Sequence, residues 1–351
     1  MPSHNSEQNI HKKEYNLGLA VLKSIMCFLV ILSHFYNSTN TQGIPEYLEQ
    51  IERYAAPIFM LLSFIFSYDI LETHQKAKIC KRFERLLIPQ IGWAIIYWII
   101  YFTIDLIWKL ELEHGFSDLI WQIFCGHSLQ LNASMWYQID LIYLTLLFLI
   151  VIIVFKKMHK KILCILCLFA LFAQYSGINM IFDNYRFELK YPLGRFLEML
   201  PLAVTGFMIS STGLLNNLKE NKLIVAISSF SIIILIKKYE VFSYIIGYGY
   251  SGIEMIVVSC AFVSLFYIVP FSKLNKSAKV IIGFITKYTL GIYCMHRLIG
   301  TLLNIAIIRL NWSILKPNSF TECVFIYIIS FMFSHIGVKI LSKTNLTALF
   351  N

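Results

Sequence analysis

Lys23 and His34 are the two residues of this sequence whose chemistry fits least with their surroundings. They stand at the ends of KSIMCFLVILSH, in which only Ser24 and Ser33 interrupt an apolar run. Eleven α-helical steps turn the chain through about 1100°, close to three full turns, and rise about 16 Å, so both side chains lie on one helix face at different depths. An imidazole can accept a proton near neutral pH, which makes His34 a candidate general base. Lys23 is then a candidate source of positive potential along the same path.

The solvent around this pair is predicted to be a membrane. Hydrophobic residues make up 58% of the 351 residues and charged residues only 14%, which excludes an ordinary soluble domain. A charge at the centre of a bilayer costs about 2.5–3.5 kcal/mol even on the mildest scale, so Lys23 is expected to face a protein interior or a wet cavity. Two alternatives stay open: Lys23 snorkels to the inner headgroups, and His34 is an interfacial residue like Tyr36.

Apolar runs long enough to cross a hydrocarbon core of about 30 Å recur along the whole chain. No long polar segment separates them, which indicates one all-α integral-membrane bundle of about ten transmembrane helices. The seventh run is short for a span, and the ninth is long and is expected to bend or emerge at Gly300. The ten runs cover residues 17–36, 54–71, 86–108, 136–155, 162–180, 191–210, 223–236, 250–269, 280–306 and 320–341.

Lysine and arginine are concentrated at the amino terminus and in every second loop between these runs. The loop before the third run carries Lys76, Lys78, Lys81, Arg82 and Arg85. By the positive-inside rule this distribution predicts that both termini are cytoplasmic. The predicted plan is a cytoplasmic segment 1–16, a transmembrane domain 17–342 and a cytoplasmic tail 343–351. Topology and lipid headgroups account for the net charge of +10, so no nucleic-acid partner is expected.

The cysteines and histidines predict neither a disulfide framework nor a metal site. Cys164 and Cys167 form a C-x-x-C, but they stand in an apolar helix without histidine or carboxylate partners, so packing is their expected role. External His114 and His127 lack metal-ligand spacing and are interpreted as surface residues. The sequence also contains no phosphate-binding loop or nucleotide fingerprint. No bound cofactor is therefore expected.

Several short segments resemble a known family in their order along the chain. Lys23-x10-His34 is similar to the Arg-x10-His signature in the first helix of the integral-membrane acyltransferases called acyltransferase family 3. KRFERLLIPQIGW, from Lys81, resembles the Arg-x-x-Arg and Leu-Ile-Pro that open the third helix of that family. Further resemblances are RYAAPIFMLLSFIFS from Arg53, MWYQIDLIYL from Met135, GRFLEMLPLAVTGFMI from Gly194 and YTLGIYCMHRLI from Tyr288. Together they span essentially the whole chain.

The resemblance implies transfer of an acyl group, commonly acetyl from cytoplasmic acetyl-CoA as co-substrate, to a hydroxyl of a cell-surface or lipid-linked carbohydrate. His34 and Lys23 are then the expected catalytic residues. Arg82 and Arg85 are three residues apart and would present two guanidinium groups to the phosphates of CoA from one helix face. The chain departs from the family at Lys23, which keeps the positive charge of the usual arginine but loses its planar five-donor fork.

Aromatic and histidine residues near the ends of later spans are further candidates for a substrate pocket. Trp136 and Tyr137 are either residues of an interfacial aromatic belt or residues that stack on the acceptor. His296, in the family-like segment IYCMHR, either lines the pocket or anchors a helix end together with Arg297.

Charged residues within the spans are weighed in the same way. Arg195 and Glu198 are three residues apart, which favours a structural ion pair over a role in the pocket. Glu254, near the start of the eighth run, is expected to balance Lys23 or another buried cation.

The predicted function is that of a multi-pass O-acyltransferase in a bacterial cytoplasmic membrane. The rival function is a transporter or flippase for a lipid-linked glycan, which needs basic inner loops and buried charges but no base. A glycan polymerase is disfavoured because the longest external loop, about residues 109–135, is modest. The expected partners are membrane lipids and a carbohydrate acceptor, and either this bundle completes the transfer or a separate protein does so on the outer side. The sequence predicts no oligomeric state.

Overall fold

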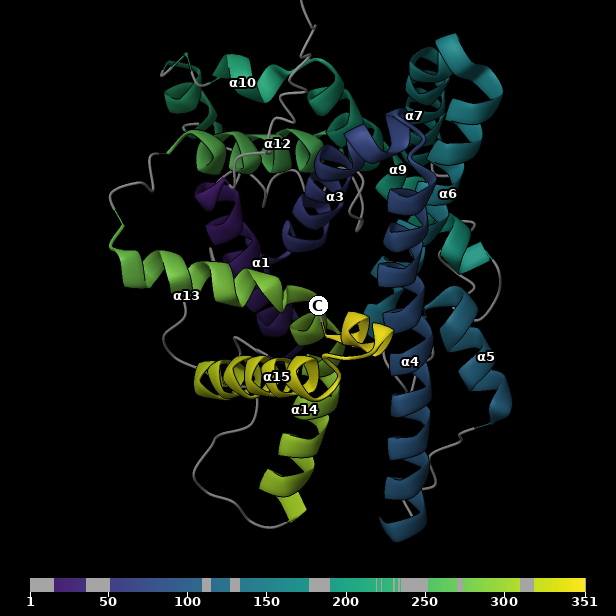
Figure 1. The fold of residues 1–351 in the computed structure, drawn as a ribbon, viewed down its shortest axis with the longest axis vertical. Helices are drawn as coiled ribbons and strands as arrows, with labels where there is room; N and C mark the ends of the chain where they lie inside the picture. Colours follow the sequence, from purple (N-terminus) through teal and green to yellow (C-terminus); the bar gives the residue numbers. More distant parts are fainter. Residues whose placement is uncertain are drawn as a thin grey trace, which may run out of the picture.

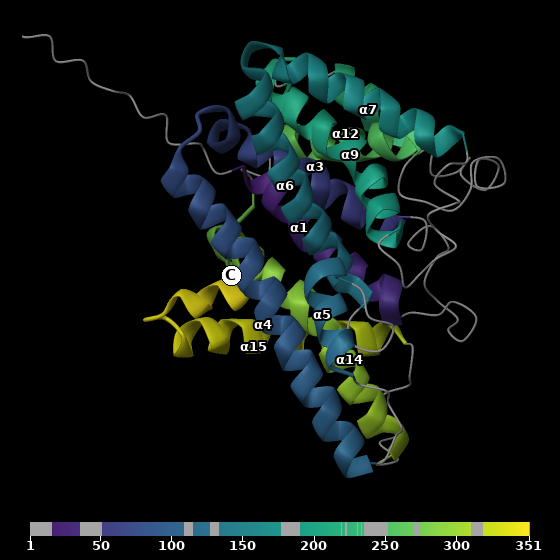
Figure 2. The ribbon, with the colours of Figure 1, turned by 90° about the vertical axis from the view of Figure 1, so that its right-hand side faces the viewer.

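The structure is a computed structural model, and every regular element among its described residues is a helix. Figures 1 and 2 show the helices as one bundle in which α4 is the longest rod and α12, α13 and α15 cross it at steep angles. The described residues are 16–35, 51–108, 115–126, 133–176, 190–218, 220–221, 223–229, 231–232, 234, 252–269, 274–309 and 319–350. The predicted segment 1–16, apart from Asn16, lies outside them, as do His114 and His127.

The α-helices follow the predicted apolar runs closely at most positions. They are α1 (Leu17–Phe35), α3 (Ala55–Glu72), α4 (Lys76–Trp108), α5 (Phe116–Cys125), α6 (Trp136–Phe155), α7 (His159–Tyr175), α9 (Lys190–Ser211), α10 (Leu214–Leu218), α12 (Ile253–Ile268), α13 (Lys276–Lys287), α14 (Thr289–Arg309) and α15 (Phe320–Ile340). Short 3₁₀ turns, η2 (Ala133–Met135), η3 (Lys156–Met158) and η5 (Asn345–Leu349), complete the described elements.

Seven helical stretches within the described residues are long and apolar enough to cross a membrane. One of them is the run Trp136–Tyr175, which contains both α6 and α7 with the turn η3 between them. Helix α12 is apolar but shorter, and the predicted run 223–236 is described only in part. The multi-pass helical membrane fold is therefore supported, whereas the count of ten spans and the cytoplasmic termini stay predictions.

The predicted ninth run, 280–306, is wrong as a single span. The chain forms two helices there, because α13 ends at Lys287 and α14 begins at Thr289. Tyr288 lies between them, 2% exposed, and its hydroxyl hydrogen bonds to His335 of α15 at 3.1 Å. Helix α14 then continues through Gly300, where a bend was expected. The glycine has no side chain there, and the ring of Phe35 fills the space.

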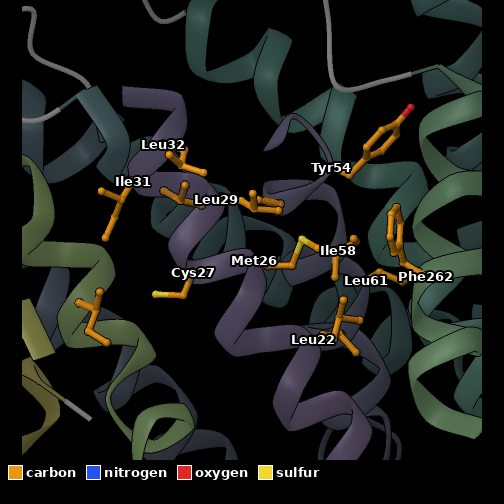
Figure 3. Close-up of a cluster of buried hydrophobic side chains, with 14 of the residues drawn as sticks. Leu22, Met26, Cys27, Leu29, Ile31, Leu32, Tyr54, Ile58, Leu61 and Phe262 are labelled. Carbon is orange, nitrogen blue, oxygen red and sulfur yellow. The ribbon is translucent and has the colours of Figure 1, made fainter. Parts of the chain in front are cut away.

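Two clusters of buried apolar side chains hold the bundle together. The first joins α1 to α3, α4, α12, α14 and α15, and the second joins α3 and α4 to α6, α7 and α9. Figure 3 shows part of the first cluster, with Leu22 and Met26 of α1 facing Ile58 and Leu61 of α3. At Gly206 of α9 a Cβ atom would lie 2.4 Å from the carbonyl oxygen of Leu61, so the glycine lets α9 and α3 approach closely. Helices α3 and α4 thus contribute side chains to both clusters.

The last described residues pack back onto the bundle. The indole N–H of Trp93 on α4 donates to the carbonyl oxygen of Leu349 at 2.8 Å. A Cβ atom at Gly92 would lie 2.4 Å from the Leu349 side chain, and one at Gly337 would lie 2.6 Å from the Phe350 ring. Glycines on α4 and α15 therefore make the space that this segment fills.

Candidate active site

The amino-terminal end of α4 forms a basic wall of one cavity in the bundle. The 33 residues of α4 extend for about 50 Å, more than a hydrocarbon core of about 30 Å, so one end must project from it. A cavity of about 500 Å³ lies against this end. Five cationic side chains line it: Lys23 of α1 and Lys78, Lys81, Arg82 and Arg85 of α4. The structure thus brings the predicted catalytic lysine and both predicted CoA-binding arginines to one cavity.

Arg82 is held by neighbours on two other helices. Its guanidinium donates to the hydroxyl of Thr145 on α6 at 3.1 and 3.3 Å and to that of Ser63 on α3 at 3.2 Å. Ser63 also lines the cavity. These acceptors are neutral, so they orient the guanidinium without cancelling its charge. Arg85, one turn further along α4, is exposed at the same wall.

Lys23 reaches the cavity from α1 beside an aromatic ring. Its Nζ atom lies 5.0 Å from the centre of the Phe66 ring, within the range of a cation–π contact. Lys23 is partly exposed, as the cavity interpretation requires and as a fully buried cation would not be.

A row of aromatic rings connects the cavity to His34. Tyr137 and Tyr293 both line the cavity, and their ring centres are 5.9 Å apart. Tyr293 lies 5.8 Å from His296, its neighbour one turn along α14. His296 stacks on His34 at 5.3 Å with an angle of 20° between the rings. His34 therefore lies one imidazole away from the cavity residues, although it does not line the cavity itself.

Two contacts fix the turn of α14 that carries His296. The buried hydroxyl of Tyr97 on α4 accepts a hydrogen bond from the backbone N–H of Leu298 at 2.8 Å and donates one to the carbonyl of Cys294 at 2.9 Å. One turn later, the ring of Phe35 occupies the space at Gly300. The residue after His34 is thus wedged against α14, which keeps the two imidazoles together.

The two ring nitrogen atoms of His296 have different surroundings. Its Nδ1 atom hydrogen bonds to the carbonyl of Tyr293, which lies on the same helix. Its Nε2 atom is buried and has no hydrogen-bond partner among the described residues. A buried ring nitrogen without a partner is costly in an apolar bundle, so this atom is a site where a substrate group or water would bind.

A second group of polar residues lies between α6 and α9. Arg195 and Glu198 are 3.5 Å apart, the ion pair that their spacing predicts, and the Arg195 guanidinium also lies 4.7 Å from the Trp136 ring. Asp140 is 1% exposed on α6, and its Oδ2 atom has no hydrogen-bond partner among the described residues. Trp136 thus contacts the guanidinium of Arg195 and does not line the basic cavity, in contrast to Tyr137.

A family model of the acyltransferase domain of membrane O-acyltransferases matches residues 16–338, nearly the whole chain. The chain belongs to acyltransferase family 3. No curated protein and no solved structure matches it at the threshold applied. The matched range includes the basic wall of α4, both cavity tyrosines and the two stacked histidines.

Glu254 of this family 3 acyltransferase does not lie beside Lys23. It stands in the first turn of α12, whereas Tyr267 and Ile268, at the other end of that helix, share a cavity with Lys23. Thirteen helical steps of 1.5 Å separate Glu254 from Tyr267, about 20 Å in all. Of the two partners expected for Glu254, Lys23 or another buried cation, the second stays a prediction.

Sequence reasoning did not single out Tyr97, Tyr293, Gln138 or Asp140 in this acyltransferase. Gln138 donates to the carbonyl of Leu86 at 2.6 Å and so ties α6 to α4 just beyond the basic wall. Gln138 and Asp140 could have been found, because polar residues in an apolar span are rare and usually face a bundle interior. The two tyrosines gave no such signal, since tyrosine is common at membrane interfaces.

Proposed function

We propose that this acyltransferase transfers an acetyl group from acetyl-CoA to a hydroxyl of a cell-surface or lipid-linked carbohydrate. The observation that carries the proposal is the basic cavity at the end of α4, which connects through Tyr293 and His296 to His34. A donor with several phosphates and an acceptor hydroxyl need these two environments in that order. Acetyl as the acyl group and carbohydrate as the acceptor rest on the family resemblance.

The charge of the cavity supports a donor of the CoA type. Coenzyme A carries phosphate groups at one end and an uncharged arm that ends in the thioester. Guanidinium groups bind phosphates through paired, charge-assisted hydrogen bonds, and Arg82 is already oriented by neutral acceptors. A volume of about 500 Å³ is within the usual range for ligand sites. The arm would then extend from the arginines towards Tyr137 and Tyr293.

The stacked histidines support a base-assisted transfer. His34 would accept the proton of the acceptor hydroxyl while that oxygen attacks the thioester carbonyl. The carbon–sulfur bond then breaks, and the departing thiolate of CoA takes the proton from the His34 imidazolium. Two imidazolium charges 5.3 Å apart would repel each other, so the pair holds one added proton at a time. Direct transfer and a covalent relay both remain compatible with this arrangement.

The test compares two losses of activity in purified protein reconstituted in vesicles. The double variant Arg82→Gln, Arg85→Gln is expected to raise the KM for acetyl-CoA at least about a hundredfold, because two charged phosphate contacts of about 1.5–3 kcal/mol each are removed. His34→Ala is expected to lower kcat by about 10²–10⁴ with little change in that KM. Ser33→Ala, next to His34 on α1 but exposed, is the matched control and should leave both constants unchanged.

The same experiment separates transfer from transport. If His34→Ala kept full activity, His34 would not be the base. If the protein moved a lipid-linked glycan between leaflets without consuming acetyl-CoA, the flippase would replace the acyltransferase proposal.

A further inference from the structure

A second and larger cavity, of about 1360 Å³, lies between α1, α3, α10, α12 and α13. It shares Lys23 and Phe66 with the donor cavity, but its remaining walls are different. Its cations come from α13 and α1 and not from α4: they are Lys23, Lys276, Lys279 and Lys287. No acidic residue is among the described residues that line it. The cavity is therefore strongly positive, and the arginines of the proposed donor site do not reach it.

Helix α13 turns its polar side towards this cavity. The helical pitch places Lys276, Lys279, Gly283, Thr286 and Lys287 within about 100° of one another, and all five line the cavity. A helix at the surface of a soluble domain does the opposite and turns its charged side to bulk water. The cavity is therefore a polar site that α13 helps to enclose.

The opposite side of α13 is suited to acyl chains. Ile281, on that side, is 57% exposed, and no residue of α13 is fully buried. Phe284, at the border of the two sides, packs edge-on against Phe331 of α15 at 5.3 Å. A twelve-residue helix with lysines on one side and the exposed Ile281 on the other has the composition of a helix that lies in a membrane interface.

Aliphatic residues form the far wall of the same cavity. Ile65 of α3, Ile209 of α9 and Leu215 of α10 line the cavity together with the lysines of α13. A soluble phosphate compound would gain little from such a wall, whereas a lipid can place its headgroup on the lysines and its first methylene groups on the aliphatic side chains. This mixed lining favours a lipid over a soluble anion.

We propose that the cavity between α13 and α1 binds the phosphate headgroup of an anionic phospholipid. Lys276, Lys279 and Lys287 supply positive charge along the length of the cavity, and Lys23 connects this lipid site with the donor cavity. The site is independent of the acyl-transfer proposal, because it requires neither acetyl-CoA nor His34.

Native mass spectrometry of the full chain titrated with phosphatidylglycerol tests the proposal. The triple variant Lys276→Gln, Lys279→Gln, Lys287→Gln is expected to bind this lipid about a hundredfold more weakly, since each lysine near a lipid surface contributes about fivefold. The matched control is Lys157→Gln, Lys161→Gln, Lys343→Gln, which removes three exposed lysines elsewhere and should bind like the wild type. The arginine triple variant at the first three positions should keep the affinity, and it also guards against a loss caused by misfolding.

Three outcomes would overturn the lipid site. The first is an equal loss of affinity in the two glutamine variants, which would mean diffuse attraction to the basic surface. The second is displacement of phosphatidylglycerol by inorganic phosphate at similar concentration, which would mean a site for soluble phosphate. The third is displacement by CoA that persists in Arg82→Gln, Arg85→Gln, which would make the cavity part of the donor site. None of these outcomes bears on whether the protein transfers acetyl groups.

Discussion

Lys23 is the residue at which this chain departs from its family, and its position explains why lysine can serve. It lines both cavities, with its Nζ atom over the Phe66 ring. A flexible ammonium group on a four-carbon stem supplies positive potential to either cavity without a fixed geometry of donors. We therefore propose that the charge, rather than the planar arginine fork, is what the site requires here.

Replacing Lys23 tests this interpretation. Lys23→Met keeps the length of the side chain but removes the charge, so it should raise the KM for acetyl-CoA by about 10- to 100-fold, the value of one charge-assisted contact. Lys23→Arg should stay close to the wild type. The readout is the rate of acetyl-CoA consumption at varied donor concentration, with Lys161→Met as a control for loss of charge at an exposed site. Wild-type kinetics in Lys23→Met would contradict the role of the charge.

The sequence could predict the shared helix face of Lys23 and His34, because it follows from the helical pitch within one apolar run. It could not predict that His296 stacks on His34. That contact depends on the crossing of α1 and α14, which the packing of Phe35 at Gly300 sets. Packing between distant segments has no signature in either segment alone.

At the scale of elements, the attachment of α4 to α14 positions His296. The hydroxyl of Tyr97 bridges the N–H of Leu298 and the carbonyl of Cys294, the two backbone groups on either side of that histidine. The bridge attaches this turn of α14 to α4, the helix that also carries the basic wall. Tyr97 is thus a positioning residue and not a catalytic one.

Tyr97→Phe should therefore act on the rate and not on donor binding. Loss of the buried hydroxyl leaves two backbone groups to find other partners, at a cost of about 1–3 kcal/mol in stability. We expect a lower melting temperature and a lower kcat with an unchanged KM for acetyl-CoA. Tyr101→Phe is the control, because the Tyr101 hydroxyl hydrogen bonds to a side chain of α14, that of Thr301, at 3.2 Å. A raised KM in Tyr97→Phe would contradict the positioning role.

The helices of this fold could largely be predicted from apolar runs, but mean hydropathy alone does not reveal the break in the ninth run. Residues 280–306 are apolar enough on average to be read as one span. The lysines and threonine on one side of α13 are spaced so that they face one cavity, which average hydropathy does not detect. The spacing of the polar residues along Lys276–Lys287, considered separately from mean hydropathy, would have indicated an amphipathic helix before Tyr288.

At the scale of the whole molecule, the function depends on which side of the membrane the basic cavity faces. Acetyl-CoA is made in the cytoplasm, so the proposed function requires the end of α4 that carries Lys78, Lys81 and Arg82 to be cytoplasmic, which the positive-inside rule also predicts. Cys80 is exposed among these residues and offers a natural probe of that side. Ser117 is exposed on α5, in the loop predicted to be external, and offers a site for the opposite probe.

Labelling with a membrane-impermeant maleimide should therefore distinguish the two positions. In intact cells a cysteine introduced by Ser117→Cys should react and Cys80 should not, whereas after permeabilisation both should react. Cys80→Ser provides the background from the remaining cysteines, which are buried or only partly exposed. Reaction of Cys80 in intact cells would place the basic cavity outside, away from acetyl-CoA. It would then contradict the orientation and the donor assignment together, while leaving the family and the helical fold unchanged.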